Sequence, residues 1–465
     1  MSTLAPLLKL EVRRLLRDRA VFAMLVVFAL LAAYATHAGV RWADGRAIAV
    51  AQVVIEADET MALRRESFVE TVAKGEKPNF GLIYATALPF RAGLPNTPLA
   101  ALSAGQAEGY PAAAAISPFV DPFGIFARYA TGLESPAVLA AGRLDLAFVI
   151  VTLLPLLLIA GNYDLWSRDV ESGRARIQLA QPVSPGALIF GRAAVRGTML
   201  LVATTAIAIL VLALAGGTGD PTGLAVFGSI VLVYCAFWIV ASALINLFVR
   251  TSTTAALACG TAWLALVILI PAALAAATDL AAPPPSERAY TNAVRSAGLE
   301  VRGAHAETAR AAATAQSDRA YPATLWHSRR EITARDARLG PIHHAYAKGW
   351  DDHRALAHGL RLLSPAVLAQ DAFDRLAGTD SSRALTFQDQ ARAFAGQVRQ
   401  LAFDWMDADR LLTLADYETG LPRFRFIEPA RATGLTIDLA ALLLSTAALL
   451  LLAALRLRRG ASALL

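Results

Sequence analysis

The sequence predicts an all-α polytopic membrane protein, with six transmembrane helices and a mainly helical extracytoplasmic domain built from two insertions. Of the 465 residues, 56% are hydrophobic and only 17% are charged, whereas soluble proteins average about 25% charged residues. Six segments are apolar and long enough to cross a bilayer core of about 30 Å as helices. Two long, more polar stretches follow the first and the fifth of these segments.

The order of the segments gives the domain organisation. The first residues place leucines on one helical face and basic side chains on the other, which predicts a helix lying in the membrane interface. The predicted parts are an interfacial helix (1–19), span one (20–38), insertion one (39–143), span two (144–162), an inside loop (163–196), spans three to five (197–277), insertion two (278–433), span six (434–455) and a tail (456–465).

Each insertion has its own pattern. Residues 47–75 lack proline, and lack glycine until the end, so we expect one long helix that continues the first span. The prolines spread over 78–122 predict irregular structure there. In the second insertion, the sequence predicts helical stretches around 286–320 and 384–414.

Four residues within or beside the spans are notable. Pro155 in the second span and Pro271 in the fifth predict kinks, because proline removes a helical hydrogen bond. Asp145 and Asp438 lie near the outer ends of the second and sixth spans, where an acid is cheap to solvate.

Basic residues predict the orientation. Fourteen of them lie in the segments expected to face inside, and none lies in the short outside turn 216–223. The positive-inside rule therefore places both termini in the cytoplasm and both insertions outside. The net charge of +6 is explained by this topology, so we expect membrane lipid, and no nucleic acid, as a partner. Cys235 and Cys259 lie in apolar runs and are interpreted as small buried hydrophobes.

Several catalytic motifs are absent from the sequence. It contains no G-x-x-x-x-G-K-[ST], so we expect no ATP hydrolysis by this chain itself and no catalytic residue. Neither G-x-S-x-G nor H-E-x-x-H occurs. His343, His344 and His353 in the second insertion are weak candidates for metal ligands. Their spacing matches no closed structural site, so a solvated helical segment is favoured and no metal is predicted.

The inside loop 163–196 carries the clearest functional signal. It is short, arginine-rich and tied to two spans, and a partner that pushes on membrane helices needs a short rigid element of this kind. Residues 164–174 predict a helix with Gly173 near its end and with Glu171, Arg174 and Arg176 exposed. Ser184 before Pro185 predicts the start of the helix that becomes the third span. A merely solvated loop is the alternative.

At this point the chain resembles the permease subunit of ABC-2-type transporters. It is similar in particular to the bacterial subgroup that has two large extracytoplasmic insertions. Besides the order of segments, the residues that carry the resemblance are Glu171, Gly173, Pro182-Val183-Ser184, Leu363-Ser364-Pro365-Ala366 and Leu376-Ala377-Gly378-Thr379.

The resemblance implies a multi-pass protein of the bacterial inner membrane that forms a dimer of permeases, either a homodimer or a heterodimer. It implies separate cytoplasmic ATPase subunits that hold ATP and Mg, and no cofactor in this chain. Residues 4–19 would be the connecting elbow helix, and 164–181 would include the coupling helix. The residues expected to couple to the ATPase are Asp164, Arg168, Glu171, Gly173, Arg174, Arg176 and Gln178.

Three functions remain open from the sequence. The first is a permease that moves or exports an unidentified substrate across the membrane. The second is mechanotransmission, in which ATP-driven motion is relayed to an extracytoplasmic partner and nothing crosses the bilayer. The third is a membrane-anchored metal-handling protein or enzyme that uses the histidine-rich insertion.

Overall fold

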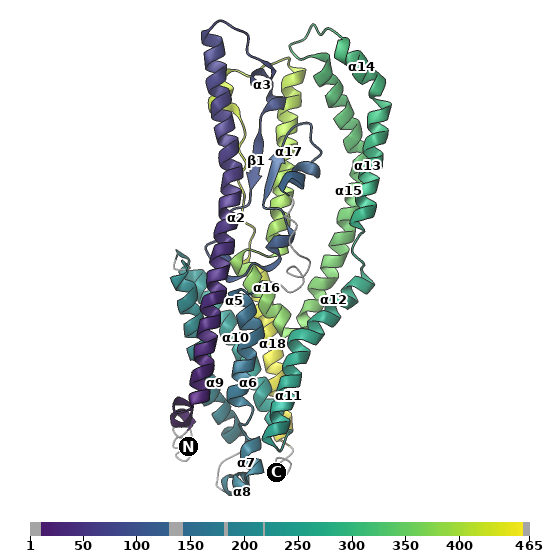
Figure 1. Ribbon diagram of the computed structural model, residues 1–465. Coiled ribbons are helices and arrows are strands. Elements are labelled where there is room, and N and C mark those ends of the chain that lie inside the picture. Colours follow the sequence, from purple (N-terminus) through teal and green to yellow (C-terminus); the bar gives the residue numbers. More distant parts are fainter. Residues whose placement is uncertain (1–10, 130–142, 181–184, 217–218, 459–465) are drawn as a thin grey trace.

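The computed structural model describes residues 11–129, 143–180, 185–216 and 219–458, and it shows an elongated helical molecule (Figure 1). Among these residues, six helical segments are long and apolar enough to cross a membrane. They are Arg19–Ala73, Leu146–Glu171, Leu188–Leu214, Pro221–Asn246, Ser252–Ala281 and Ala432–Leu457. The prediction of an all-α polytopic membrane protein with six transmembrane helices is therefore confirmed.

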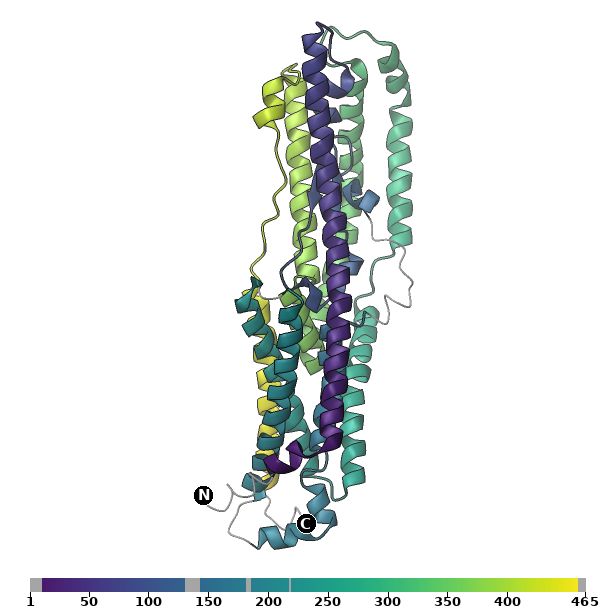
Figure 2. The same cartoon turned by 60° about the vertical axis from the view of Figure 1, so that its left-hand side comes forward.

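The first span is part of one continuous helix, α2 (Arg19–Ala73), of 55 residues. At 1.5 Å per residue this helix is about 82 Å long, and it runs from the apolar bundle almost to the far end of the molecule (Figure 2). Asp18 caps its start, because its carboxylate accepts from the main-chain N–H of Ala20 at 2.9 Å. Residues 11–16 form a helical stretch before α2, whereas residues 1–10 of the expected interfacial helix lie outside the described residues.

The remaining spans pack into one bundle around α10 (Figure 1). Their elements are α5 (Leu146–Phe148), η5 (Val149–Leu153), α6 (Leu154–Asn162), α9 (Pro185–Leu214), α10 (Pro221–Asn246), α11 (Ser252–Leu264), η7 (Ala265–Leu269), α12 (Ile270–Ala281) and α18 (Ala432–Leu457). Two short helices, α7 (Ser167–Glu171) and α8 (Arg174–Leu179), lie between the second and third spans.

Both prolines expected to kink a span follow a π-helical turn. Pro155 is the second residue after η5, and Pro271 is the second residue after η7. Since proline has no N–H, the carbonyl four residues earlier loses its helical donor. At Pro155 this carbonyl belongs to Val151, and the Tyr234 hydroxyl donates to it at 2.8 Å. A neighbouring helix thus satisfies the carbonyl that the proline leaves free, as a helix in lipid requires.

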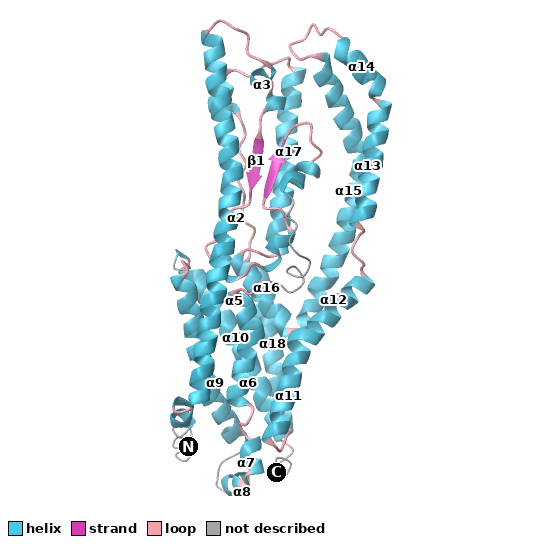
Figure 3. Ribbon diagram, viewed as in Figure 1, coloured by secondary structure: helices cyan, strands magenta, loops and turns pink. Residues whose placement is uncertain are grey.

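Beyond the bundle, the described parts of 39–129 and 282–431 form an elongated unit, here called the distal domain. Its helices are α3 (Phe80–Ile83), α13 (Glu287–Ala304), α14 (Ala306–Thr314), α15 (Ala323–Leu360), α16 (Pro365–Ala377) and α17 (Ser381–Asp407). Of these, α16 packs against α10 and α18 and shares the core of the bundle. The shorter turns of the distal domain are η1 (Ala85–Ala87), η2 (Ala100–Leu102), η3 (Gly105–Gly109), η4 (Gly124–Tyr129), η8 (Arg361–Leu363) and η9 (Asp416–Gly420). An antiparallel pair, β1 (Phe90–Gly93) and β2 (Ala113–Ile116), lies between α2 and α17 (Figure 3).

The core of the distal domain forms where this strand pair meets α17. Phe90 of β1 packs edge-on against Phe394 of α17, with ring centroids 6.2 Å apart. Phe387 and Trp405 of the same helix are buried in the same cluster. Burial of these aromatic rings stabilises the contact, because large apolar surfaces leave water.

The second insertion contains a helix that the sequence patterns did not predict. The expected stretches at 286–320 and 384–414 correspond to α13 with α14 and to α17, whereas α15 is a further helix of 38 residues. It passes through Pro341 without ending. It packs along α13, and at its start the buried Tyr321 donates to the Arg410 carbonyl at 2.7 Å. Tertiary contacts therefore hold this helix in place.

Asp145 and Asp438 attach the distal domain to the bundle. Asp145 caps α5 by accepting from Phe148 N–H at 2.8 Å, and it also accepts from Ala104 N–H of the distal domain at 2.9 Å. Asp438 of α18 is fully buried and pairs with Arg361 at 2.6 Å and with Arg375 at 3.1 Å. Both acids are thus buried and bonded to protein groups at this junction, so the expectation that water solvates them is wrong.

Candidate functional site

The loop between the second and third spans folds into two short helices at the end of the bundle that is remote from the distal domain (Figure 1). The first, α7, ends at Glu171, and the second, α8, begins at Arg174. Gly173 joins them with φ of +72°, in the left-handed region that favours glycine. The expected single helix over 164–174 is thus a turn followed by α7, and the chain reverses at Gly173.

Asn246, the last residue of α10, holds the start of α7. Its Oδ1 accepts from the main-chain N–H groups of Trp166 and Ser167 at 3.2 and 3.3 Å. Its Nδ2 donates to the Ser242 carbonyl at 2.9 Å. The Asn246 side chain is fully buried, so these bonds form without competition from water. The fourth span is therefore fixed to the beginning of the loop.

A buried charge network connects this loop to the N-terminal stretch and to the third span. Arg196 of α9 donates to Glu11 at 2.9 Å and to Asp164 at 2.8 Å. One turn earlier on α9, Arg192 pairs with Asp169 of α7 and lies 3.5 Å from Glu11. All five side chains are mostly withdrawn from solvent, so their attractions are screened less than surface pairs. The network joins three segments that are separate in the sequence.

Glu171 contacts the turn between the fourth and fifth spans. Its carboxylate accepts from the Ser252 N–H at 3.1 Å and from the Ser252 hydroxyl at 2.9 Å. Ser252 is the first residue of α11, so the end of α7 is tied to the start of the fifth span. Movement of α7 would therefore act on four spans and on residues just before α2.

The predicted coupling residues divide into two groups. Asp164 and Gln178 face inward, since Asp164 pairs with Arg196 and Gln178 donates to Asp169 at 3.0 Å. The outward group is exposed on α7 and α8, and it consists of Arg168, Glu171, Gly173, Arg174 and Arg176. The structure thus brings all seven residues into one compact element, with five of them accessible.

Several residues of this element were missed at the level of sequence. They are Glu11, Asp169, Ile177, Arg192, Arg196 and Asn246. Ile177 of α8 is 68% exposed. From the sequence, Arg192 and Arg196 served only as evidence for the orientation of the spans. Their spacing of four residues also places both on one face of a helix. A single exposed apolar side chain is common on protein surfaces, so Ile177 is of interest because it lies on α8 beside the exposed Arg176.

The three histidine candidates do not lie together as a metal-binding set. His343 is buried between Asp121, which its Nε2 contacts at 3.0 Å, and the Tyr290 hydroxyl, at 2.8 Å from its Nδ1. The Nδ1 of His353 contacts the Ala282 carbonyl at 2.7 Å. Across the described ranges, no group of three His, Cys, Asp or Glu side chains is placed to hold a metal ion.

The six spans and the anchored helix pair define the class of this protein: a polytopic membrane protein with a short helical element projecting from one end of its bundle. The family model described as "ABC-2 family transporter protein" matches residues 5–460, almost the whole chain. The chain therefore belongs to the ABC-2 transporter family, and it is a membrane transport component. Comparison with curated proteins and with solved structures gives no match.

Proposed function

We propose that this chain is the permease subunit of an ATP-binding cassette transporter in the bacterial inner membrane. A separate cytoplasmic ATPase, which supplies ATP and Mg, docks on α7 and α8, and the chain pairs with a second permease, identical or related. Its termini face the cytoplasm and the distal domain faces outside. Membership of the ABC-2 family supports this proposal, and so does the concentration of basic residues at the α7–α8 end of the bundle.

The observation that carries the proposal is the contrast between the two faces of the loop. Its inner face is fixed by Asn246 and by the buried charge network, whereas its outer face exposes Arg176 and Ile177. An element held in this way moves as a unit with the spans when a partner pushes on it. A freely solvated loop would absorb the same force by bending.

One feature favours mechanotransmission as a second candidate function. α2 is one unbroken helix from the first span into the distal domain, so a displacement at its membrane end is carried outward without a hinge. In mechanotransmission, the ATPase closes on ATP, this motion reshapes the distal domain, and nothing crosses the bilayer. The docking of the ATPase is common to both candidates.

The test is recovery of the ATPase with the tagged chain. We would purify the chain from native membranes in mild detergent, identify the accompanying protein by mass, and measure ATP hydrolysis. Arg176→Glu with Ile177→Asp should reduce ATPase recovery at least tenfold while the chain elutes normally in size exclusion. The matched control is Arg295→Glu with Leu299→Asp at exposed positions of the distal helix α13, which should leave recovery unchanged. Equal recovery from both variants would overturn the assignment of the docking site.

A further inference from the structure

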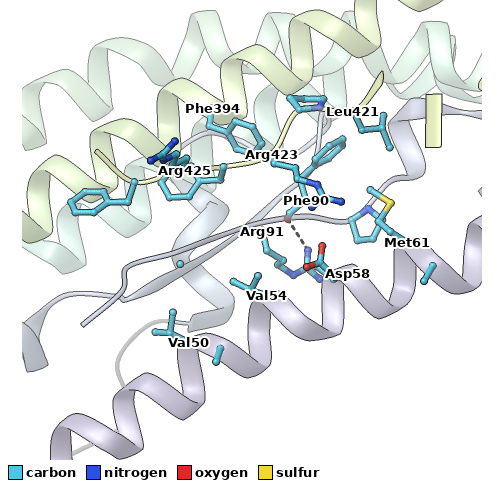
Figure 4. A pocket seen from close by; sticks show the side chains of 18 of the residues that line it. Val50, Val54, Asp58, Met61, Phe90, Arg91, Phe394, Leu421, Arg423 and Arg425 are labelled. Carbon is cyan, nitrogen blue, oxygen red and sulfur yellow. Dashed lines mark hydrogen bonds between the residues drawn. The ribbon is translucent and has the colours of Figure 1, made fainter. Parts of the chain in front are cut away.

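The distal domain contains an open groove with a volume of about 1340 Å³, here called the distal groove (Figure 4). Its lining comes from α2, from β1 and the residues just beyond it, from the segment 417–426, and from Phe394 of α17. It lies far from α7 and α8, and the proposed function makes no use of it. The groove is therefore a separate candidate site.

The α2 wall sets the length of the distal groove. Lining residues run from Ala47 to Arg65, which is about 27 Å of helix at 1.5 Å per residue. Val50, Val54 and Met61 give this wall its apolar character. About eight residues of extended chain cover this length, since each advances about 3.3 Å. The groove thus has room for a peptide strand.

The β1 wall offers a free strand edge. The N–H of Leu94, just after β1, donates to the Ala112 carbonyl at 2.8 Å, and the pairing register is antiparallel. Because bonded and non-bonded pairs alternate in such a ladder, the main-chain groups of Arg91 and Gly93 point away from β2. Gly93 fits closely against α2, where a Cβ atom would lie 2.7 Å from Val50 Cγ1. An exposed strand edge is a template for adding another strand.

The opposite wall is an extended segment with alternating faces. Phe424 and Phe426 turn inward and pack on Phe387 of α17, with ring centroids 5.8 and 6.1 Å away. Arg423 and Arg425 alternate with them and are exposed. In an extended chain, residues two apart lie on the same side about 6.6 Å from each other. The two guanidinium groups thus repeat at the spacing of alternate residues in a second extended chain.

The charge of the groove is unbalanced. Of its six charged lining residues, Arg65 and Glu418 form an ion pair at 2.7 Å. Among the described residues, Arg91, Arg423 and Arg425 form no ion pair with a carboxylate, and Asp58 is the one acid left to face them. Elsewhere in the distal domain many arginines are paired, as Arg383 is with Glu428. Three guanidinium groups that face a single carboxylate leave the groove with a net positive charge, which favours an anionic ligand with several carboxylates.

We infer that the distal groove binds an extended acidic peptide segment of a partner protein, which adds as a strand to the free edge of β1. Its alternate carboxylates pair with Arg423 and Arg425, and the side chains between them rest on the apolar wall of α2. Strand addition uses the main chain for affinity and alternate side chains for specificity. A lipid tail would use the apolar wall but not the strand edge, so the peptide accounts for more of the groove.

The probe is a fluorescein-labelled eight-residue peptide of alternating glutamate and valine, titrated with the purified full chain in detergent and followed by fluorescence anisotropy. Three results are expected. The peptide binds, its affinity falls as salt is raised, and a lysine–valine peptide of the same length binds at least tenfold more weakly. A version of the acidic peptide with every second amide N-methylated should also bind at least tenfold more weakly, because it cannot complete the hydrogen bonds of the strand ladder.

The key variant is Arg423→Glu with Arg425→Glu, which should weaken binding of the acidic peptide at least tenfold. The matched control, Arg295→Glu with Arg302→Glu, makes the same charge change at exposed positions of α13 and should bind like the native chain. Equal binding by both variants, or undiminished binding of the N-methylated peptide, would overturn the inference. Displacement of the peptide by a lysophospholipid that binds more tightly would reassign the groove to lipid and also overturn it.

Discussion

The buried charge network around Arg196 gives a quantitative test of how the loop is held. Arg196→Met keeps much of the side-chain volume but removes the charge that pairs with Glu11 and Asp164, while its own side chain is only 8% exposed. Removing one partner of a buried pair usually costs about 3–5 kcal/mol. Glu11 still has Arg192 at 3.5 Å, and Asp164 still has the half-exposed Arg168 at 3.2 Å. We therefore expect the free energy of unfolding to fall by an amount near the lower end of this range, about 3 kcal/mol.

The assay is thermal unfolding of the detergent-purified chain, followed by intrinsic tryptophan fluorescence. At roughly 2 °C per kcal/mol for a chain of this size, Arg196→Met should lower the midpoint by about 6 °C. Arg176→Met, an exposed arginine on α8, is the control and should change stability by less than about 0.5 kcal/mol. Adding Glu11→Gln and Asp164→Asn to Arg196→Met should restore most of the loss, because no unpaired acid remains buried. The reasoning would be refuted if Arg196→Met alone unfolded at the same temperature as the native chain. It would also be refuted if the triple variant unfolded no higher than Arg196→Met alone.

Three further predictions concern the loop and the distal domain. Gly173→Val should disturb the turn between α7 and α8 and reduce ATPase recovery, because φ of +72° is strained for a branched residue; Gly173→Asn, which tolerates that region, should recover the ATPase nearly as well as the native chain. Asn246→Ala should lower the unfolding free energy by about 1–3 kcal/mol, since two buried N–H groups lose their acceptor. Burial alone would raise the pKa of Asp121, but hydrogen bonds from His343 and from a main-chain N–H outweigh it and hold that pKa below its usual value. The ionised carboxylate therefore stabilises the fold above the pKa of an unfolded aspartate, about 3.9, and this stabilisation is lost as the pH falls through the lower pKa of the folded chain. We expect the melting temperature to drop below about pH 4, and Asp121→Asn should make that drop smaller.

The sequence was enough to predict the parts of the fold that depend on local pattern. Spans are recognised by their apolar length, and the continuation of α2 beyond the first span follows from the absence of proline and glycine over 47–73. α15 was missed because its apolar residues are sparse and Pro341 interrupts them, and its stability comes from packing on α13. Local propensity is weak wherever tertiary contacts decide the structure.

The same distinction applies to the two sites. Composition and position pointed to the loop 163–196, but its anchors are a buried asparagine on α10 and an acid before α2, which only the folded chain brings near. The distal groove depends even more on tertiary structure. β1 and the segment 417–426 are far apart in the sequence, and the free edge of β1 is defined by its pairing with β2. No local pattern distinguishes Arg423 and Arg425 from the many paired arginines of the distal domain.

The walls of the distal groove continue directly into two membrane helices. α2 contains the first span and forms one wall without a break. The segment 417–426 forms the other, and only a few residues separate it from α18, the sixth span. A change in the distance between these spans therefore changes the width of the groove, because neither wall has a long linker to absorb it. At the other end, Glu11, just before α2, is held by Arg196 of the network around α7. A continuous line of packed and covalent contacts thus connects the exposed loop to the groove, through the helix that is about 82 Å long.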